Sequence, residues 1–260
     1  MNRLLLAGLL LAVFPAHAAI VGKQVQYKAD GLTMKGYVAY DDAIKAKRPG
    51  VLVVHEWWGL NDYARKRANM LAQEGYVALA VDMYGDGRTA DHPKDAGAFA
   101  GAVGKDPAAA LARFKAAMAT LEQQPQTDKK NIAAIGYCFG GGQVLNMARA
   151  GLPLKGVVSF HGSLGTEHPA KPGQIKTKVR VFTGAADPMA PADVAAAFEK
   201  EMQEAQADYK LVSYPGAMHA FTNPDADKLG KQFDLPLKYD AAADRDSWTQ
   251  TLAFFKEIFK

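Results

Sequence analysis

Short apolar runs alternate with segments of helical periodicity along most of the chain. The runs at 49–59, 76–85 and 131–136 are nearly continuous in hydrophobic residues, as strands buried on both faces are. Between two of them, the segment 107–124 begins with proline and carries a core-facing stripe at helical spacing, formed by Leu111, Phe114, Met118 and Leu121. This alternation predicts an α/β fold whose sheet is mostly parallel and covered by helices on both faces.

The remaining segments continue the alternation. An antiparallel strand pair is expected near the start, because 25–27 and 34–40 flank the turn signal Ala29-Asp30-Gly31. We expect further strands at 155–160, 178–184 and 209–214, and further helices at 61–74, 140–150, 191–207 and 247–259. In such sheets ligands bind beyond the carboxyl ends of the strands, so side chains that directly follow a strand are candidates for chemistry.

The first 18 residues have the pattern of a secretory signal peptide. Arg3 precedes an apolar run at 4–14, and Ala16-His17-Ala18 offers a small-x-small cleavage site. The run is shorter than the roughly 20 apolar residues that span a bilayer. We therefore expect cleavage after Ala18, a single domain over 19–260, a periplasmic or secreted location, and no stable membrane anchor after removal; an uncleaved anchor is the alternative.

The amino-acid composition indicates which classes of binding partner are supported. The chain is 49% hydrophobic and 22% charged, which is ordinary for a globular domain. Its formal net charge of +4 comes from scattered residues rather than from a basic block, which gives no support for nucleic-acid binding. We expect a monomer that acts on a small molecule.

Cys138 is the only cysteine in the sequence, so an exported chain could not use it in an internal disulfide. Most unpaired cysteines are small buried hydrophobes. Here, however, the thiol lies between Gly136 and Gly140 at a strand-to-helix junction, which is the thiol form of a nucleophile elbow. The amino end of the following helix favours a thiolate.

Asp187 and His219 also follow strands directly, in GAADPMAP and GAMHAF. The order nucleophile, acid, histidine is that of α/β-hydrolases. Histidine would shuttle the proton, and the aspartate would fix its tautomer and stabilise the imidazolium. The sequence thus predicts a Cys-His-Asp triad made of Cys138, His219 and Asp187.

Five motifs together resemble the dienelactone hydrolase family: HEWWG at 55–59, VDMYGDGR at 81–88, GYCFGG at 136–141, GAADPMAP at 184–191 and GAMHAFTNP at 216–224. The resemblance implies an α/β-hydrolase fold and ester or lactone hydrolysis without a cofactor. It also implies the same triad, with Glu56 controlling the proton of the thiol. In this context the N–H groups of Trp57 and Phe139 would form the oxyanion hole.

The chain departs from the family at the positions expected to bind a substrate carboxylate. Two arginines are expected there. Asn223 occupies one position, and Arg88 is slightly displaced from the other. The loss of a bidentate clamp should weaken anion binding, so dienelactone itself is a less secure assignment than hydrolase chemistry. The aromatic side chains of Trp58, Tyr84 and Phe221 are candidates for the pocket wall.

His55 and His161 follow strand runs, and each either lines the pocket or has a structural role. A zinc site from His55, Glu56 and His161 lacks the usual ligand spacing, so no metal is predicted. Three other functions stay open: an exported thioesterase or carboxylesterase with an unrelated substrate, a non-catalytic small-molecule-binding protein, and a redox thiol protein. The redox function would need a resolving cysteine, which the chain does not contain.

Overall fold

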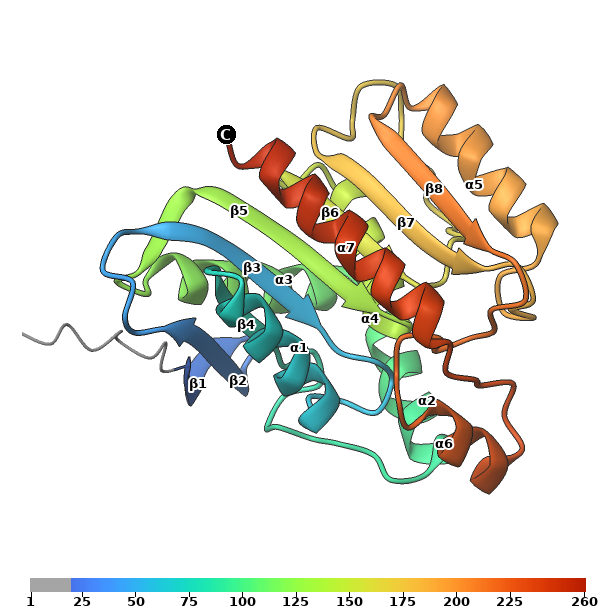
Figure 1. Ribbon diagram of the computed structural model, residues 1–260, viewed down its shortest axis with the longest axis horizontal. Coiled ribbons are helices and arrows are strands. Elements are labelled where there is room, and N and C mark those ends of the chain that lie inside the picture. The colour runs from blue at the N-terminus through green and yellow to red at the C-terminus, as the bar shows by residue number, and fades with distance from the viewer. Residues whose placement is uncertain (1–19) are drawn as a thin grey trace, which may run out of the picture.

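One eight-stranded sheet forms the centre of the protein. We describe residues 20–260 of a computed structural model; the predicted signal peptide at 1–18 lies outside the described residues. The strand order is β1-β2-β4-β3-β5-β6-β7-β8, as Figure 1 shows. The strands are β1 (Ile20–Ala29), β2 (Leu32–Asp41), β3 (Arg48–Val54), β4 (Val77–Val81), β5 (Thr127–Tyr137), β6 (Gly156–Phe160), β7 (Lys178–Gly184) and β8 (Tyr209–Tyr214). β1 and β2 pair antiparallel, β2 pairs antiparallel with β4, and all other neighbours are parallel.

Helices cover both faces of this sheet. They are α1 (Asp62–Gln73), α2 (Pro93–Gly104), α3 (Pro107–Glu122), α4 (Phe139–Arg149), α5 (Ala192–Glu204), α6 (Ala226–Phe233) and α7 (Ala241–Ile258). One hydrophobic cluster joins the sheet to α2, α3, α4 and α5, and another joins the opposite face to α1 and α7. In Figure 1, α1 and α7 lie in front of the sheet, with α3 and α4 behind it.

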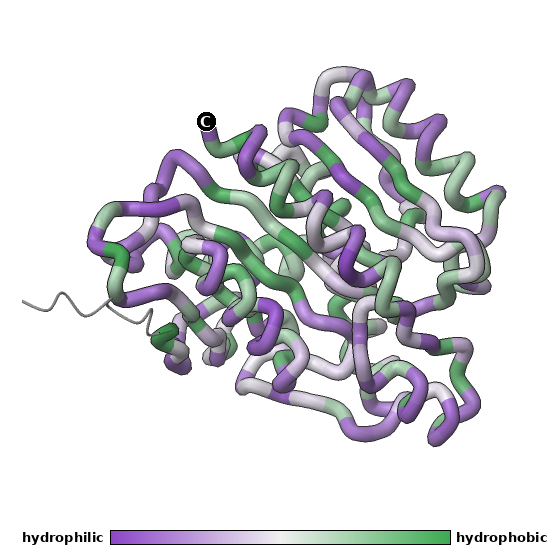
Figure 2. Tube along the Cα trace, in the orientation of Figure 1, coloured by the Kyte–Doolittle hydropathy of each residue, from purple (hydrophilic) through white to green (hydrophobic). Residues whose placement is uncertain are grey.

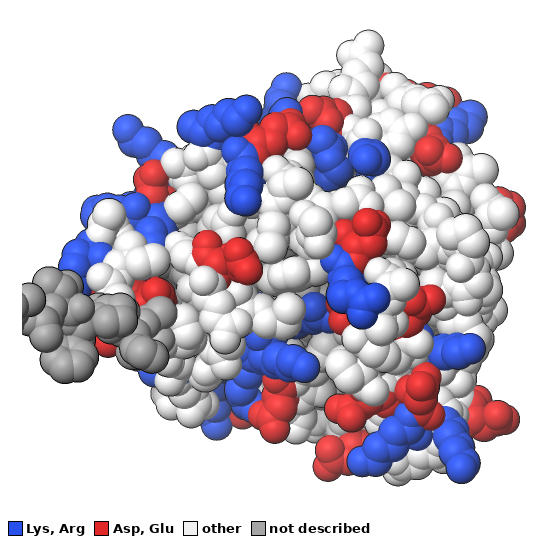
Figure 3. Space-filling view, in the orientation of Figure 1, with Lys and Arg blue, Asp and Glu red and all other residues white. Residues whose placement is uncertain are grey.

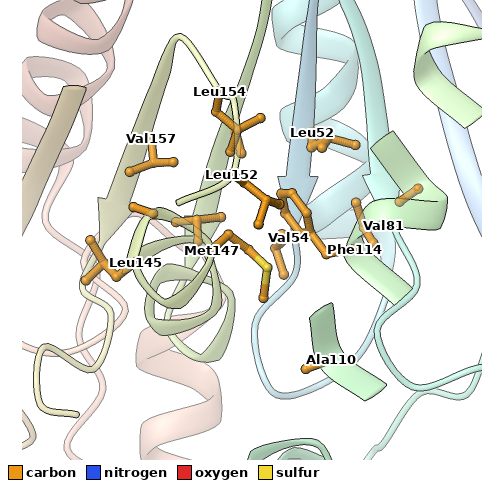
Figure 4. Close-up of a cluster of buried hydrophobic side chains, with 14 of the residues drawn as sticks. Leu52, Val54, Val81, Ala110, Phe114, Leu145, Met147, Leu152, Leu154 and Val157 are labelled. Carbon is orange, nitrogen blue, oxygen red and sulfur yellow. The ribbon is translucent and has the colours of Figure 1, made fainter. Parts of the chain in front are cut away.

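Successive side chains of a buried strand point to opposite faces of the sheet, so each strand contributes to two separate hydrophobic cores. In β3, Leu52 and Val54 belong to the core under α3 and α4, whereas Val51 and Val53 belong to the core under α1 and α7. Figure 4 shows Leu52 and Val54 among the side chains of the first core, and Figure 2 shows the apolar stretch along the central strands. Burial on both faces explains why these strands are continuously hydrophobic.

The predicted fold class is confirmed, with three local differences. Helices α2 and α6 were not predicted, and α7 begins at Ala241 rather than at 247. In α2 only Ala96 and Val103 are buried, so the segment has almost no apolar periodicity to detect. The earlier start of α7 follows from capping, because the Asp240 carboxylate accepts the N–H groups of the first helical turn.

The surface carries both charge signs. In the view of Figure 3, basic and acidic side chains are interspersed, and no broad field of one sign is visible on that face. None of the helices within residues 20–260 is both long and apolar enough to cross a membrane.

Candidate active site

Cys138 lies on a sharp turn between β5 and α4. Its backbone has φ +53° and ψ −116°, a region that side-chain-bearing residues rarely adopt. The turn is possible because Gly136 and Gly140 pack backbone against backbone: a Cβ on Gly136 would lie 2.0 Å from the carbonyl oxygen of Gly140. Cys138 is only partly buried. The fold therefore displays the thiol at the amino end of α4.

His219 and Asp187 meet at the same edge of the sheet. Their side chains are buried, and Nδ1 of His219 lies 2.8 Å from Oδ2 of Asp187. Because a carboxylate only accepts, Nδ1 carries the proton of this bond. The other carboxylate oxygen accepts the N–H of Met189 at 2.8 Å, which fixes its orientation. This is the geometry in which an aspartate sets the tautomer of a histidine.

The second nitrogen of His219 is the one left for the thiol, which lies close enough to raise the pKa of the imidazole. Nε2 is buried and makes no hydrogen bond of normal geometry within residues 20–260. Burial lowers the pKa of His219, but the charge of Cys138 and the hydrogen bond with Asp187 outweigh it and raise the pKa to about 10. An imidazole in this setting is stabilised in its protonated form beside the sulfur.

The loop that carries His219 is fastened by the segment before α7. His219 and Leu237 form an isolated parallel bridge, and the carbonyl of His219 accepts the N–H of Lys238 at 3.1 Å. The N–H of Asp240 donates to the carbonyl of Phe221 at 3.0 Å. The position of the imidazole thus depends on residues near the C-terminal helix.

Glu56 is buried beside this pair, with 3% of its surface exposed. Its Oε2 accepts the side-chain amide of Asn223 at 2.7 Å. Burial raises the pKa of Glu56 to about 7, against the lowering effects of the Asn223 hydrogen bond and the charge of His219. A carboxyl group with this pKa can hold or release a proton near neutral pH.

Two backbone N–H groups just beyond the ends of β3 and β5 have no backbone acceptor in the described part of the chain. Within residues 20–260, neither Trp57 nor Phe139 appears as the donor of a backbone hydrogen bond outside the regular elements, whereas Cys138 and Gly140 do. Phe139 is the first residue of α4, so its N–H has no partner within the helix. The carbonyl of Trp57 accepts the hydroxyl of Tyr84 at 2.8 Å. The predicted oxyanion donors come from the ends of β3 and β5, which are adjacent strands.

Comparison with known proteins gives the family. The model of the dienelactone hydrolase family matches residues 34–259. The chain belongs to the dienelactone hydrolase family. It is 30% identical to Protein usf of Aquifex pyrophilus over 248 residues, covering 91% of this chain and 99% of the relative.

Solved structures of family members agree. A dienelactone hydrolase-like promiscuous phosphotriesterase from metagenomic libraries is 34% identical, with a TM-score of 0.84 over 92% of this chain and 99% of that chain. The structure called m3DLH is 37% identical, with a TM-score of 0.88 over 93% and 100%. Membership of the dienelactone hydrolase family makes this chain a carboxylic ester hydrolase with the α/β-hydrolase fold.

The substrate-pocket candidates predicted from the sequence separate into two groups. Phe221 and His161 have no exposed surface, and their rings lie 5.2 Å apart in the interior. His161 also lies 5.3 Å from the ring of His219, so both side chains lie behind the imidazole rather than on a pocket wall. Trp58, 5% exposed, lines a cavity of about 290 Å³ whose wall also includes Asn61, Tyr63, Asn223, Leu229 and Phe233.

The two positions at which the dienelactone hydrolase family is expected to bind a carboxylate serve other purposes here. Asn223 is 3% exposed and holds Glu56. The guanidinium of Arg88 donates to the carbonyls of Tyr84 and Gly85 and lies over the ring of Phe99. Neither side chain is a free anion-binding group in this conformation.

Sequence reasoning missed a buried polar network beneath the thiol turn. The N–H of Cys138 donates to Nδ1 of His161 at 3.1 Å, so Nε2 carries the proton and donates to Oγ1 of Thr222 at 2.7 Å. Thr222 bonds to the hydroxyl of Tyr63 at 2.6 Å, and Arg67 donates to that hydroxyl and to the carbonyl of Thr222. Arg67 falls on the buried face of α1 by helical spacing, which is the one signal that could have found it.

No set of three or more His, Cys, Asp or Glu side chains in the described part of the chain is arranged to hold a metal ion. Both ring nitrogens of His55 form hydrogen bonds with backbone groups. Those of His161 form hydrogen bonds with the N–H of Cys138 and with the hydroxyl of Thr222. Neither ring therefore has a nitrogen left over to bind a metal ion or a substrate.

Proposed function

We propose that this protein hydrolyses esters or lactones of small molecules through an acyl-enzyme on Cys138. The observation that carries the proposal is the buried pair of His219 and Asp187, beside which the Cys138 thiol lies on a strained turn. Lactone hydrolysis is the reaction for which the dienelactone hydrolase family is named, so the family relationship supports the proposal as well.

The reaction follows from the roles of these groups. The Cys138 thiolate attacks the carbonyl carbon, and the N–H groups of Trp57 and Phe139 receive the oxyanion. As the tetrahedral intermediate collapses, the carbon–oxygen bond to the leaving group breaks and His219 gives that alkoxide its proton. Water then loses a proton to His219 and attacks the thioester, which releases the acid and restores the thiolate.

The substrate class follows from the leaving group and from the charges around Glu56. An alkoxide leaves more readily than an amide nitrogen, so esters and lactones are favoured over peptides. A substrate carboxylate would have to lie beside Glu56 with Asn223 already engaged and Arg88 tied to its own loop. We therefore propose that neutral lactones are turned over at least as well as anionic ones, and that dienelactone is not the preferred substrate.

The test of the reaction is a burst experiment on mature protein with p-nitrophenyl acetate. One equivalent of p-nitrophenol per Cys138 should appear before the steady state, and it should be absent in Cys138→Ala. A folded His219→Ala variant should lose turnover. Hydrolysis that persists in Cys138→Ala would refute the nucleophile, and a wild type that binds esters without hydrolysing them would favour the non-catalytic binding protein.

A second experiment addresses the substrate class. A panel of neutral lactones, anionic lactones and dienelactone is compared by kcat/KM, with Asn223→Arg as the matched variant. The arginine would restore a guanidinium beside the pocket and should shift preference toward anionic substrates. A wild type that strongly prefers dienelactone over an uncharged ester would contradict this part of the proposal.

A relative at 34% identity is described as a promiscuous phosphotriesterase, which makes phosphotriester hydrolysis a second candidate activity. The same nucleophile and N–H donors could hold a phosphoryl oxygen during attack on phosphorus. Paraoxon, an uncharged phosphotriester, is the direct probe. Release of p-nitrophenol beyond one equivalent would support turnover, while release of no p-nitrophenol would remove this candidate.

We also propose export with cleavage after Ala18, on the sequence pattern alone. Intact-mass measurement of the protein recovered from the periplasm or medium of the producing cell should give a chain that begins at Ala19. Recovery of the full-length chain from membranes would favour the uncleaved anchor.

A further inference from the structure

We infer that His55 is a positioning residue that orients the oxyanion donor of Trp57. The inference rests on the proposed function, because an oxyanion hole has meaning only for acyl transfer. His55 touches no reacting atom. It acts through the peptide group that joins Glu56 to Trp57.

The ring of His55 is fixed on every side. It is 1% exposed, stacks on Phe139 with centroids 5.7 Å apart, and meets the ring of Tyr84 edge to face at 4.8 Å. Its Nε2 accepts the N–H of Met83 at 3.3 Å. These contacts leave Nδ1 as the nitrogen that carries a proton.

That proton is directed at one carbonyl. Nδ1 of His55 donates to the carbonyl oxygen of Glu56 in a short hydrogen bond. Burial lowers the pKa of His55 to about 4, so the ring is neutral at pH 7 and keeps this tautomer. A neutral imidazole serves here as a fixed donor rather than as a proton shuttle.

The bonded carbonyl belongs to the same planar peptide group as the N–H of Trp57. In a trans peptide the C=O and N–H point in opposite directions, so holding one fixes the direction of the other. A hydrogen bond to the carbonyl also polarises the peptide and strengthens the N–H as a donor. His55 thus determines both the aim and the strength of the first predicted oxyanion donor.

The main chain of His55 reaches the second donor. Its carbonyl accepts the N–H of Gly140 at 3.1 Å, which joins the loop after β3 to the first turn of α4. Phe139, next to Gly140, is then left with a free N–H. His55 therefore lies between the two predicted donors and is linked to the segment that carries each.

The turn itself does not depend on the imidazole. The carbonyl of Glu56 also accepts the N–H of Gly59 at 3.2 Å, a bond that a substitution at His55 would keep. Replacement of the ring should therefore loosen the aim of the Trp57 N–H without unfolding the loop.

The test compares His55→Leu with His55→Asn. Leucine fills space but offers no donor, whereas the asparagine amide can place an N–H near the position of Nδ1 and bond to the carbonyl of Glu56. If His55 orients the peptide, asparagine should retain more activity than leucine. If His55 only packs between Tyr84 and Phe139, leucine should retain more. His168→Leu, at an exposed histidine, is the matched control.

Two rates are measured for each variant. The burst with p-nitrophenyl acetate reports acylation, which needs an oxyanion hole. Alkylation of Cys138 by iodoacetamide reports the thiolate alone, because displacement at a saturated carbon forms no oxyanion. We expect His55→Leu to lower acylation by at least about tenfold, up to the 10²- to 10³-fold that follows from losing one oxyanion donor, because the Trp57 N–H remains but is no longer oriented. Alkylation should change by less than about threefold, and His55→Asn should acylate at least ten times faster than His55→Leu, on the order of the donor's effect.

Several results would overturn the inference: acylation by His55→Leu at the wild-type rate, a parallel fall of acylation and alkylation, or a leucine variant faster than the asparagine variant. Should His55→Leu fail to fold by circular dichroism, His55→Asn alone decides, because a loss of more than about 100-fold in acylation would contradict the retained donor. A wild type that is alkylated by iodoacetamide but neither shows a burst nor turns over the ester would refute the proposed function itself, and the inference with it.

Discussion

Replacing Gly140 with alanine should push α4 away from β3, and the size of this shift can be calculated from the distances around Gly140. A Cβ at this position would lie 2.3 Å from the carbonyl oxygen of Val54 and 2.6 Å from that of His55. Real Cβ atoms essentially never approach closer than 3.0 Å, so α4 and β3 must separate by about 0.7 Å, the difference between 3.0 and 2.3 Å. Both obstructing atoms are backbone, which leaves no flexible side chain to move aside.

The shift has two consequences. A 0.7 Å separation stretches the 3.1 Å bond from Gly140 N to His55 O to about 3.8 Å, which is no longer a hydrogen bond. Overpacking of about 1–3 kcal/mol and this lost bond of about 1 kcal/mol are partly offset by the roughly 1 kcal/mol by which alanine favours a helix. The net loss of unfolding free energy should be about 1–3 kcal/mol. Misplacement of the thiol and of the Phe139 N–H by this distance should lower kcat/KM by about 10²-fold.

Gly142 supplies the matched control, because it lies in the same helix. A Cβ there would make ordinary contact at 3.4 Å with Ser163, so Gly142→Ala should be neutral or stabilising by up to about 1 kcal/mol. Urea unfolding and p-nitrophenyl acetate hydrolysis measure both variants. The reasoning is refuted if Gly140→Ala matches Gly142→Ala in stability and hydrolyses the ester within about threefold of the wild type, against the expected 10²-fold loss.

Three further predictions concern protons in the site. In Asp187→Asn the stabilising carboxylate is lost, so the pKa of His219 should fall below about 10 and kcat/KM should fall by about 10²- to 10⁴-fold, as a pH–rate profile would show. In Cys138→Ala the pKa of His219 should also fall, because the sulfur charge is gone; an NMR titration that matched the wild type would count against an ion pair. Because the pKa of Glu56 is raised from 4.5 to about 7 on folding, its contribution to stability is complete below pH 4.5 and is lost as pH rises through 7. Relative to Glu56→Gln, the wild type should lose up to about 3 kcal/mol of unfolding free energy over that range, measured by urea unfolding at several pH values; parallel curves would contradict the raised pKa.

The sequence predicts where most strands lie along the chain and at which of their ends chemistry is possible, because those features are local. Continuous apolar runs mark the strands buried on both faces, such as the one before Cys138, and Asp187 and His219 come soon after the strands β7 and β8. The need for glycine at 136 is equally local, because the thiol turn brings it against the backbone of Gly140, whereas Gly140 itself packs against the distant backbone of Val54 and His55. These predictions required no knowledge of which strands pair.

Side-chain contacts between residues that are far apart in the chain could not be predicted from the sequence. Arg67 and Thr222 are 155 residues apart in the chain. Nothing in the sequence around either residue indicates that the Arg67 guanidinium supports the loop that carries Thr222. Asn223 illustrates a second limit. Its position in the motif suggests substrate binding, whereas its side chain holds Glu56. The tautomers of His55 and His161 likewise depend on which backbone groups the fold brings to each ring.

The bridge between His219 and the residues before α7 has a consequence for the nascent protein. Synthesis runs from the amino end, so the elbow that carries residue 138 is made long before the stretch at 237–240 that anchors the imidazole. Until residues 237–240 have folded, the imidazole of His219 is not held in position beside the sulfur of Cys138. An incomplete chain should therefore not hydrolyse esters, and this activity should appear only when the C-terminal helix packs against the sheet.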